Sequence, residues 1–228
     1  MDLHIYSRTI EPNPINYKKV VLKRYELANK SIDTLDAADM ALVNKVSEVL
    51  EKPETFNGRE FLNFPLEAIL RYLENTHTLY LFKYVPEITQ SITHILKLED
   101  NYTSSLHALE VLFMDFRRDL KWHIHKEETD LFPHIRYLLG SLDHEISIQL
   151  HQHRNTTFSL ESFVDEHAES EVNVGILRNT LSYYTPNAET KTMVQVLHTQ
   201  LNRLENDLLI HSRIEEEVLI PLTIRLRK

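Results

Sequence analysis

The stretch His-Ile-His-Lys-Glu-Glu-Thr-Asp-Leu-Phe-Pro, residues 123–133, has a second copy later in the chain. Residues 211–221 read His-Ser-Arg-Ile-Glu-Glu-Glu-Val-Leu-Ile-Pro, so both stretches follow the pattern H-x3-E-E-x2-L-[FI]-P. A histidine and a glutamate four residues apart lie on one face of an α-helix, one turn apart. This spacing lets one helix supply two ligands to a metal ion. One copy alone would also fit a solvated charged face, but two copies that share the trailing apolar-apolar-proline, with further histidines suitably placed elsewhere, favour a metal site.

The composition predicts an all-α protein with short connections. Only 3 of the 228 residues are glycine, whereas 42% are hydrophobic and 26% are charged. No run of 18 apolar residues occurs, so we expect no membrane-spanning helix and no membrane partner. The first residues, Met-Asp-Leu-His, do not open a basic region followed by an apolar one. We therefore expect no secretory signal and a cytoplasmic protein.

Charge and cysteine content exclude several classes of function. The formal net charge of -9 argues against nucleic-acid binding through a general basic surface. The absence of cysteine excludes disulfides and thiolate metal sites. The chain contains 13 histidines and 34 acidic residues, so a metal site must be built from nitrogen and oxygen ligands.

The first part of the chain, residues 1–62, is predicted to be a small helical region. A short helix is expected over 17–30, and Asp36 or Asp39 can cap the next helix, which Pro53 stops. Residues 52–63 contain Gly58 and no apolar period, so a loop is expected there. This region is too small to hold much of a core alone, and we expect it to dock on residues 63–228.

Residues 63–228 are predicted to form an up-down-up-down four-helix bundle. The first long segment runs from about 65 to 98, and Pro86 inside it should kink it. The second runs from about 103 to 139 and ends at Gly140. The third and fourth are expected over about 160–184 and from 188 to the basic C-terminus.

The turns of this bundle predict which residues meet the two repeats. Facing residues of an antiparallel hairpin are equidistant from its turn. His167 then lies opposite His211 across the turn near 189, and His77 lies opposite His123 across the turn near 100. Glu99 is about 33 Å from His77 along the helix, which is too far for the same site. The predicted metal ligands are His77, His123, Glu127, His167, His211 and Glu215.

Four imidazoles and two carboxylates in a water-excluding bundle suit a pair of redox-active, non-haem iron ions. A bridging oxide or hydroxide would leave open positions for a small diatomic ligand such as dioxygen or nitric oxide. Ferritin-like di-iron bundles use Glu-x-x-His instead, a different spacing in the opposite order. Zinc in a mixed site remains an alternative, because ligand type alone does not select the metal.

At these residues the chain resembles the hemerythrin-like superfamily and, within it, the iron–sulfur cluster repair di-iron proteins. The resemblance covers about 65–222 and rests on Glu74-Asn75-Thr76-His77, Val85-Pro86-Glu87, the two repeats, Asp165-Glu166-His167 and Leu204-Glu205-x-Asp207-Leu208. It implies a non-haem di-iron centre, iron donation or repair of damaged iron–sulfur proteins under nitric oxide or oxidative stress, and a cytoplasmic setting. It also implies that Asp119 and Glu166 lie near the site.

Three departures from the family pattern bear on function. Counted back from the proline, the family's first-helix ligand falls on Thr78, with His77 one residue early, so His77 reaches the site only if this helix is rotated or kinked. Glu99 stands where the family has a further histidine, and residues 1–60 lack the family's cysteine pair. Two alternatives therefore stay open: a hemerythrin-like module that binds or senses dioxygen or nitric oxide, and a helical scaffold with a degenerate metal site.

Overall fold

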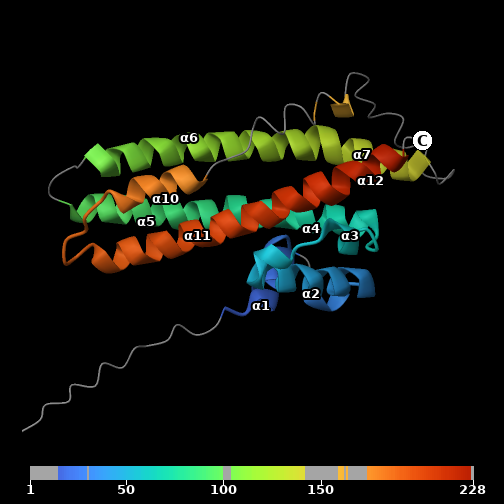
Figure 1. Ribbon diagram of the computed structural model, residues 1–228, viewed down its shortest axis with the longest axis horizontal. Helices are drawn as coiled ribbons and strands as arrows, with labels where there is room; N and C mark the ends of the chain where they lie inside the picture. The colour runs from blue at the N-terminus through green and yellow to red at the C-terminus, as the bar shows by residue number, and fades with distance from the viewer. Residues whose placement is uncertain are drawn as a thin grey trace, which may run out of the picture.

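The computed structural model describes residues 15–29, 31–99, 104–141, 159–161, 163 and 174–226. Every secondary-structure element in these ranges is a helix, and none is a strand, which confirms the all-α prediction (Figure 1). No helix within these ranges is both long and apolar enough to cross a membrane.

Three long composite helices lie side by side, and the first runs opposite to the second and the fourth (Figure 1). The first consists of α4 (Leu66–Leu79), η3 (Tyr80–Tyr84) and α5 (Val85–Leu98). The second consists of α6 (Ser104–Lys126), η4 (Glu127–Leu131) and α7 (Phe132–Ser141). The fourth consists of α11 (Lys191–Ile214), η6 (Glu215–Leu219) and α12 (Ile220–Leu226).

The third helix is described only in part. Its last turns form α10 (Val174–Ser182), which packs against α6 and α11. Residues 162 and 164–173 of the expected 160–184 helix lie outside the described residues, so the complete up-down-up-down arrangement stays a prediction.

The N-terminal helices pack against one end of the bundle, as expected. They are α1 (Tyr17–Leu27) and α2 (Ala37–Glu51), and both contact α4. Val21 and Leu42 share one hydrophobic core with Ile69 of α4 and Ile210 of α11. Asp36 caps α2, because its carboxylate accepts a hydrogen bond from the backbone N–H of Asp39 at 2.7 Å. The division of the chain at residue 62 stays a prediction.

The loop expected over 52–63 is wrong in part, because two short helices form there. They are η2 (Pro53–Thr55) and α3 (Gly58–Phe61). Phe56 and Phe61 stack with ring centroids 4.9 Å apart inside the core, which holds this segment against the bundle. Gly58 lies so close to η6 that a Cβ at this position would be 2.9 Å from Cβ of Glu217.

Each of these three composite helices changes from α to π geometry for one turn before a proline. The π-helical turns η3, η4 and η6 begin at Tyr80, Glu127 and Glu215, each six residues before Pro86, Pro133 or Pro221. Proline has no N–H to donate, and its ring clashes with the carbonyl four residues earlier. A π turn widens the helix and accommodates this defect without ending it. At Pro86 the expected kink thus takes the form of a wide turn.

Candidate metal centre

Four buried side chains from the three composite helices converge on one point in the bundle. They are His77 of α4, Glu127 at the start of η4, His211 of α11 and Glu215 at the start of η6. One ligand atom from each residue lies within 4.8 Å of the other three. Both copies of the H-x3-E-E-x2-L-[FI]-P pattern therefore contribute to a single cluster, together with His77.

The Glu127 carboxylate lies between two histidines. Its Oε1 is 2.8 Å from Nε2 of His123, and its Oε2 is 3.0 Å from Nε2 of His77. Glu127 is fully buried, whereas the side chain of His123 is 16% exposed. His123 therefore marks the edge of the cluster that faces the outside.

The second motif completes the cluster from the other side. Nε2 of His211 lies 3.3 Å from Nε2 of His77 and 3.0 Å from Oε1 of Glu215. Two neutral imidazole nitrogens would place lone pairs against each other at this distance unless a proton or another cation lies between them. Nδ1 of His211 is buried and has no hydrogen-bond partner within the described residues.

The π turn η3 explains why His77, and not Thr78, enters the cluster. His77 lies one residue earlier than the family pattern predicts when counted back from Pro86. A π turn holds about one residue more than an α turn, so it takes up this extra residue and rotates the preceding helix by about 100°. His77 is fully buried, while Thr78 donates its hydroxyl to the backbone carbonyl of Glu74 at 3.3 Å.

Glu128 orients His77, a role that was missed at the sequence level. Its Oε1 lies 3.0 Å from Nδ1 of His77, so an N–H at Nδ1 leaves Nε2 facing the cluster. The two copies differ here, because the equivalent Glu216, which is exposed like Glu128, accepts a hydrogen bond from the hydroxyl of Ser212. Burial lowers the pKa of His77, but the hydrogen bonds that its ring nitrogens donate to Glu127 and Glu128 outweigh burial and raise this pKa to about 10.

Aromatic rings enclose the two buried histidines. The ring of Phe132 stacks on His77 with centroids 5.6 Å apart and planes 7° apart. The ring of Tyr80 lies edge-on to His211 at 5.6 Å. Phe132 belongs to the apolar pair that precedes the proline of the first motif, so this part of the motif helps exclude water from the cluster.

Other residues considered in the sequence lie elsewhere. His167 and Glu166 fall outside the described residues, so their predicted positions remain predictions. Asp119 is exposed and forms an ion pair with the neighbouring Arg118. This position does not support its expected place near the site. Glu99 accepts hydrogen bonds from Asn187 Nδ2 at 2.9 Å and from the hydroxyls of Tyr184 and Thr190, in the connection between α10 and α11.

The donor set fits a metal cation. Three imidazoles and two carboxylates lie in a shielded interior, where uncompensated charged and polar groups are costly. A shared cation would compensate both carboxylates and separate the facing Nε2 atoms of His77 and His211. Nitrogen and oxygen ligands of this kind suit iron, zinc and other first-row ions.

Comparison with known proteins agrees with the motifs. No family model matches the chain. The chain is 24% identical to the iron–sulfur cluster repair protein YtfE of Escherichia coli over 194 residues, 85% of this chain and 79% of the relative. It is also 24% identical to the iron–sulfur cluster repair protein ScdA of Staphylococcus epidermidis over 182 residues, 78% of this chain and 75% of the relative. The resemblance predicted from the sequence is thus confirmed, and the chain is a distant relative of the iron–sulfur cluster repair proteins.

Proposed function

We propose that this chain is a non-haem di-iron protein of the iron–sulfur cluster repair type. The observation that carries the proposal is the convergence of both H-x3-E motifs and His77 on one buried point. The proposed iron ligands are His77, His123, Glu127, His167, His211 and Glu215.

The position of Glu127 supports two ions instead of one. Its two carboxylate oxygens divide between His123 and His77, as expected of a carboxylate that bridges two metal ions. Glu215 beside His211 is the second candidate bridge. His167 would supply the fourth imidazole from the third helix, and an oxide or hydroxide bridge would complete the centre.

Iron bound here would supply redox chemistry and open positions for a small ligand. The protein side chains would control how that ligand arrives. Glu128 holds His77 in one tautomer, and Phe132 and Tyr80 exclude water from the buried side. Because His123 is the most exposed of the proposed ligands that the structure describes, we infer that dioxygen or nitric oxide enters on its side.

The target and setting are further parts of the proposal. The names of the relatives describe repair of iron–sulfur clusters. We infer that damaged iron–sulfur proteins are partners of this chain, that it donates iron to them under nitric oxide or oxidative stress, and that it acts in the cytoplasm.

A second candidate function is favoured by the lack of cysteine. The 228 residues contain none, so this chain offers no thiolate to hold or pass on a cluster. A hemerythrin-like module that binds or senses dioxygen or nitric oxide needs only the histidine and glutamate ligands. The degenerate-scaffold alternative is less favoured, because five of the six expected ligands lie together.

Metal analysis with an optical spectrum tests the proposed centre. We expect about two irons per chain after aerobic expression in iron-replete medium, with near-ultraviolet charge-transfer bands that vanish on reduction. Glu215→Gln should lower the iron content, and Glu216→Gln, a change at the exposed neighbour, should not. Stoichiometric zinc without iron, or no metal at all, would rule out the di-iron proposal.

The two candidate functions are separated by an assay with the iron-loaded protein. A repair protein should restore activity to an enzyme whose iron–sulfur cluster nitric oxide has damaged, and should lose iron as it does so. A binding module should bind and release dioxygen or nitric oxide with its iron content unchanged and should restore nothing.

A further inference from the structure

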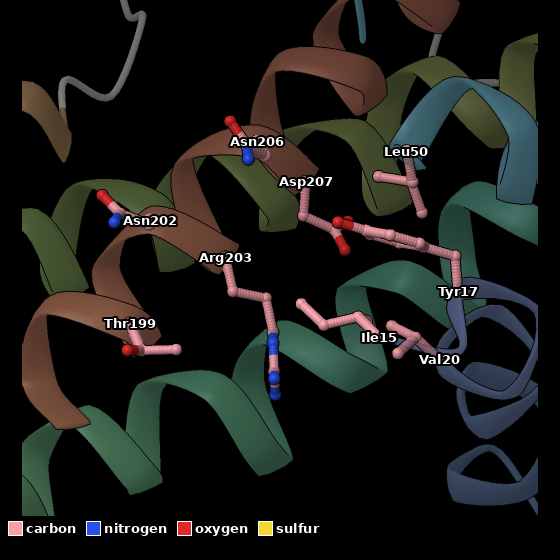
Figure 2. Close-up of a pocket in the computed structure, with 9 residues that line it drawn as sticks. All are labelled: Ile15, Tyr17, Val20, Leu50, Thr199, Asn202, Arg203, Asn206 and Asp207. Carbon is pink, nitrogen blue, oxygen red and sulfur yellow. The ribbon is translucent and has the colours of Figure 1, made fainter. Parts of the chain in front are cut away.

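A pocket separate from the candidate metal centre lies where the N-terminal helices meet α11. Its volume is about 240 Å³. Figure 2 shows the side chains that border it, which come from Ile15, α1, α2 and α11. The proposal rests on Ile15, Val20 and Leu50 on the N-terminal side and on Arg203 and Asp207 of α11.

Arg203 is an unpaired cation in the wall of this pocket. Its Nε is buried, and its guanidinium forms no hydrogen bond or ion pair with any residue that the structure describes. Every other shielded arginine within those ranges has a carboxylate partner. These arginines are Arg24, Arg71, Arg136, Arg178 and Arg213. An unsatisfied, buried N–H is unfavourable, so a missing acceptor is expected next to Arg203.

Asp207 does not fill this role, although it borders the same pocket. Both of its carboxylate oxygens bind Arg24, at 2.6 and 2.5 Å, and one also accepts from the hydroxyl of Tyr80 at 2.9 Å. The charges of Arg24 and Asp207 cancel, and Arg203 leaves the wall with one positive charge. This charge is notable in a chain whose formal net charge is -9.

We propose that this pocket binds a small organic anion with a carboxylate head and a short apolar body. The carboxylate would accept hydrogen bonds from the guanidinium of Arg203, a strong, charge-assisted interaction. The apolar body would lie against the aliphatic side chains of Ile15, Val20 and Leu50. Pockets with apolar walls and one well-placed polar group are typical of small-molecule sites.

The pocket is also connected to the candidate metal centre through two side chains. Asp207 in its wall binds Tyr80, and the ring of Tyr80 lies 5.6 Å from that of His211. None of the pocket-lining residues belongs to the proposed ligand set, so binding can be measured on protein with or without metal. Failure of one proposal therefore leaves the other intact.

Titration of the full chain with hexanoate tests the pocket. Calorimetry at constant ionic strength should give saturable binding of one hexanoate per chain. Hexan-1-ol has the same body without the charge, and inorganic phosphate has a charge without the body, so both should bind at least about tenfold more weakly. Equal binding of hexan-1-ol and hexanoate would overturn the proposal, as would no binding of hexanoate.

Variants assign the binding to this pocket. Arg203→Gln should weaken hexanoate binding about tenfold or more, and Val20→Phe should do so by filling the space. Arg117→Gln, at an exposed arginine of α6, is the matched control and should bind normally. Arg203→Gln should melt no lower than the wild type, because it removes an unpaired charge. Hexanoate binding unchanged in Arg203→Gln would overturn the assignment.

Discussion

Arg24 of α1 binds both carboxylate oxygens of Asp207 on α11, and the two residues are 183 positions apart in the chain. The Arg24 side chain is fully buried, and that of Asp207 is 3% exposed. The Arg24 guanidinium also lies 5.3 Å from the ring centroid of Tyr72. Burial lowers the pKa of Arg24, but the charge of Asp207 outweighs it and keeps this pKa above the ordinary arginine value. The ion pair thus ties the N-terminal region to the helix that carries His211.

Replacing Arg24 should destabilise the whole fold. Arg24→Met leaves the Asp207 carboxylate buried without a counter-ion, which typically costs about 3–5 kcal/mol of unfolding free energy. The double variant Arg24→Met/Asp207→Leu removes both charges and should recover much of this loss. Urea unfolding of both variants is the measurement. A double variant as unstable as the single one would contradict the buried-charge explanation.

Substitution of His77 should change the iron content, and substitution of Thr78 should not. His77→Ala removes a buried side chain of the metal cluster and should lower the iron content, whereas Thr78→Ala removes only a bond to Glu74 and should leave it nearly unchanged. Thr78→His, which restores the family spacing, should not substitute for His77, because the π turn η3 rotates position 78 away from the cluster. Iron analysis of the three variants checks this. Full iron content in His77→Ala would show that the first helix supplies no ligand.

Glu99 is expected to stabilise the fold without affecting the metal. Its carboxylate accepts hydrogen bonds from Tyr184, Asn187 and Thr190 and so joins the end of α5 to the connection before α11. Glu99→Ala leaves these donors without their acceptor and should lower the unfolding free energy by about 1–3 kcal/mol. Thermal unfolding and iron analysis test the two halves of this prediction. A fall in iron content at unchanged stability would assign Glu99 to the metal centre instead.

The pH dependence of stability should differ between metal-free and metal-loaded protein. In the metal-free protein the pKa of His77 is raised from 6.5 to about 10. Protonation of His77 therefore contributes stability that is fully present below about pH 6.5 and is lost as the pH rises through about 10. The melting temperature of chelator-treated protein should fall over this range, and His77→Gln should remove that part of the fall.

Metal should reverse this trend. Metal binding to the folded state raises stability, by roughly several kcal/mol when free metal is far above its dissociation constant. Protons compete with metal for the imidazoles, so the gain should shrink between neutral pH and about pH 5. Melting with and without a chelator at both pH values measures the gain. A melting temperature indifferent to metal at every pH would favour the scaffold alternative.

The sequence alone predicted the helical class, most helix limits and the repeated motif. These features depend on residues close together in the chain. Asp36 caps a helix through the N–H of Asp39, and His211 and Glu215 share a face because they are one turn apart. Local geometry of this kind can be derived from spacing. Because His77 and His123 are equidistant from the turn near residue 100, the sequence also indicated that His77 lies at the level of the first repeat.

Only the tertiary structure decided how these parts meet. The α-helical period of the sequence leaves the rotation of His77 open, and the π turn before Pro86 brings it into the cluster beside His211. Contacts between Glu128 and His77 and between Arg24 and Asp207 join helices far apart in the chain, so no local pattern reveals them. Whether a buried charge is paired depends on every element packed around it. For that reason the sequence alone identifies neither the ion pair of Arg24 nor the missing partner of Arg203.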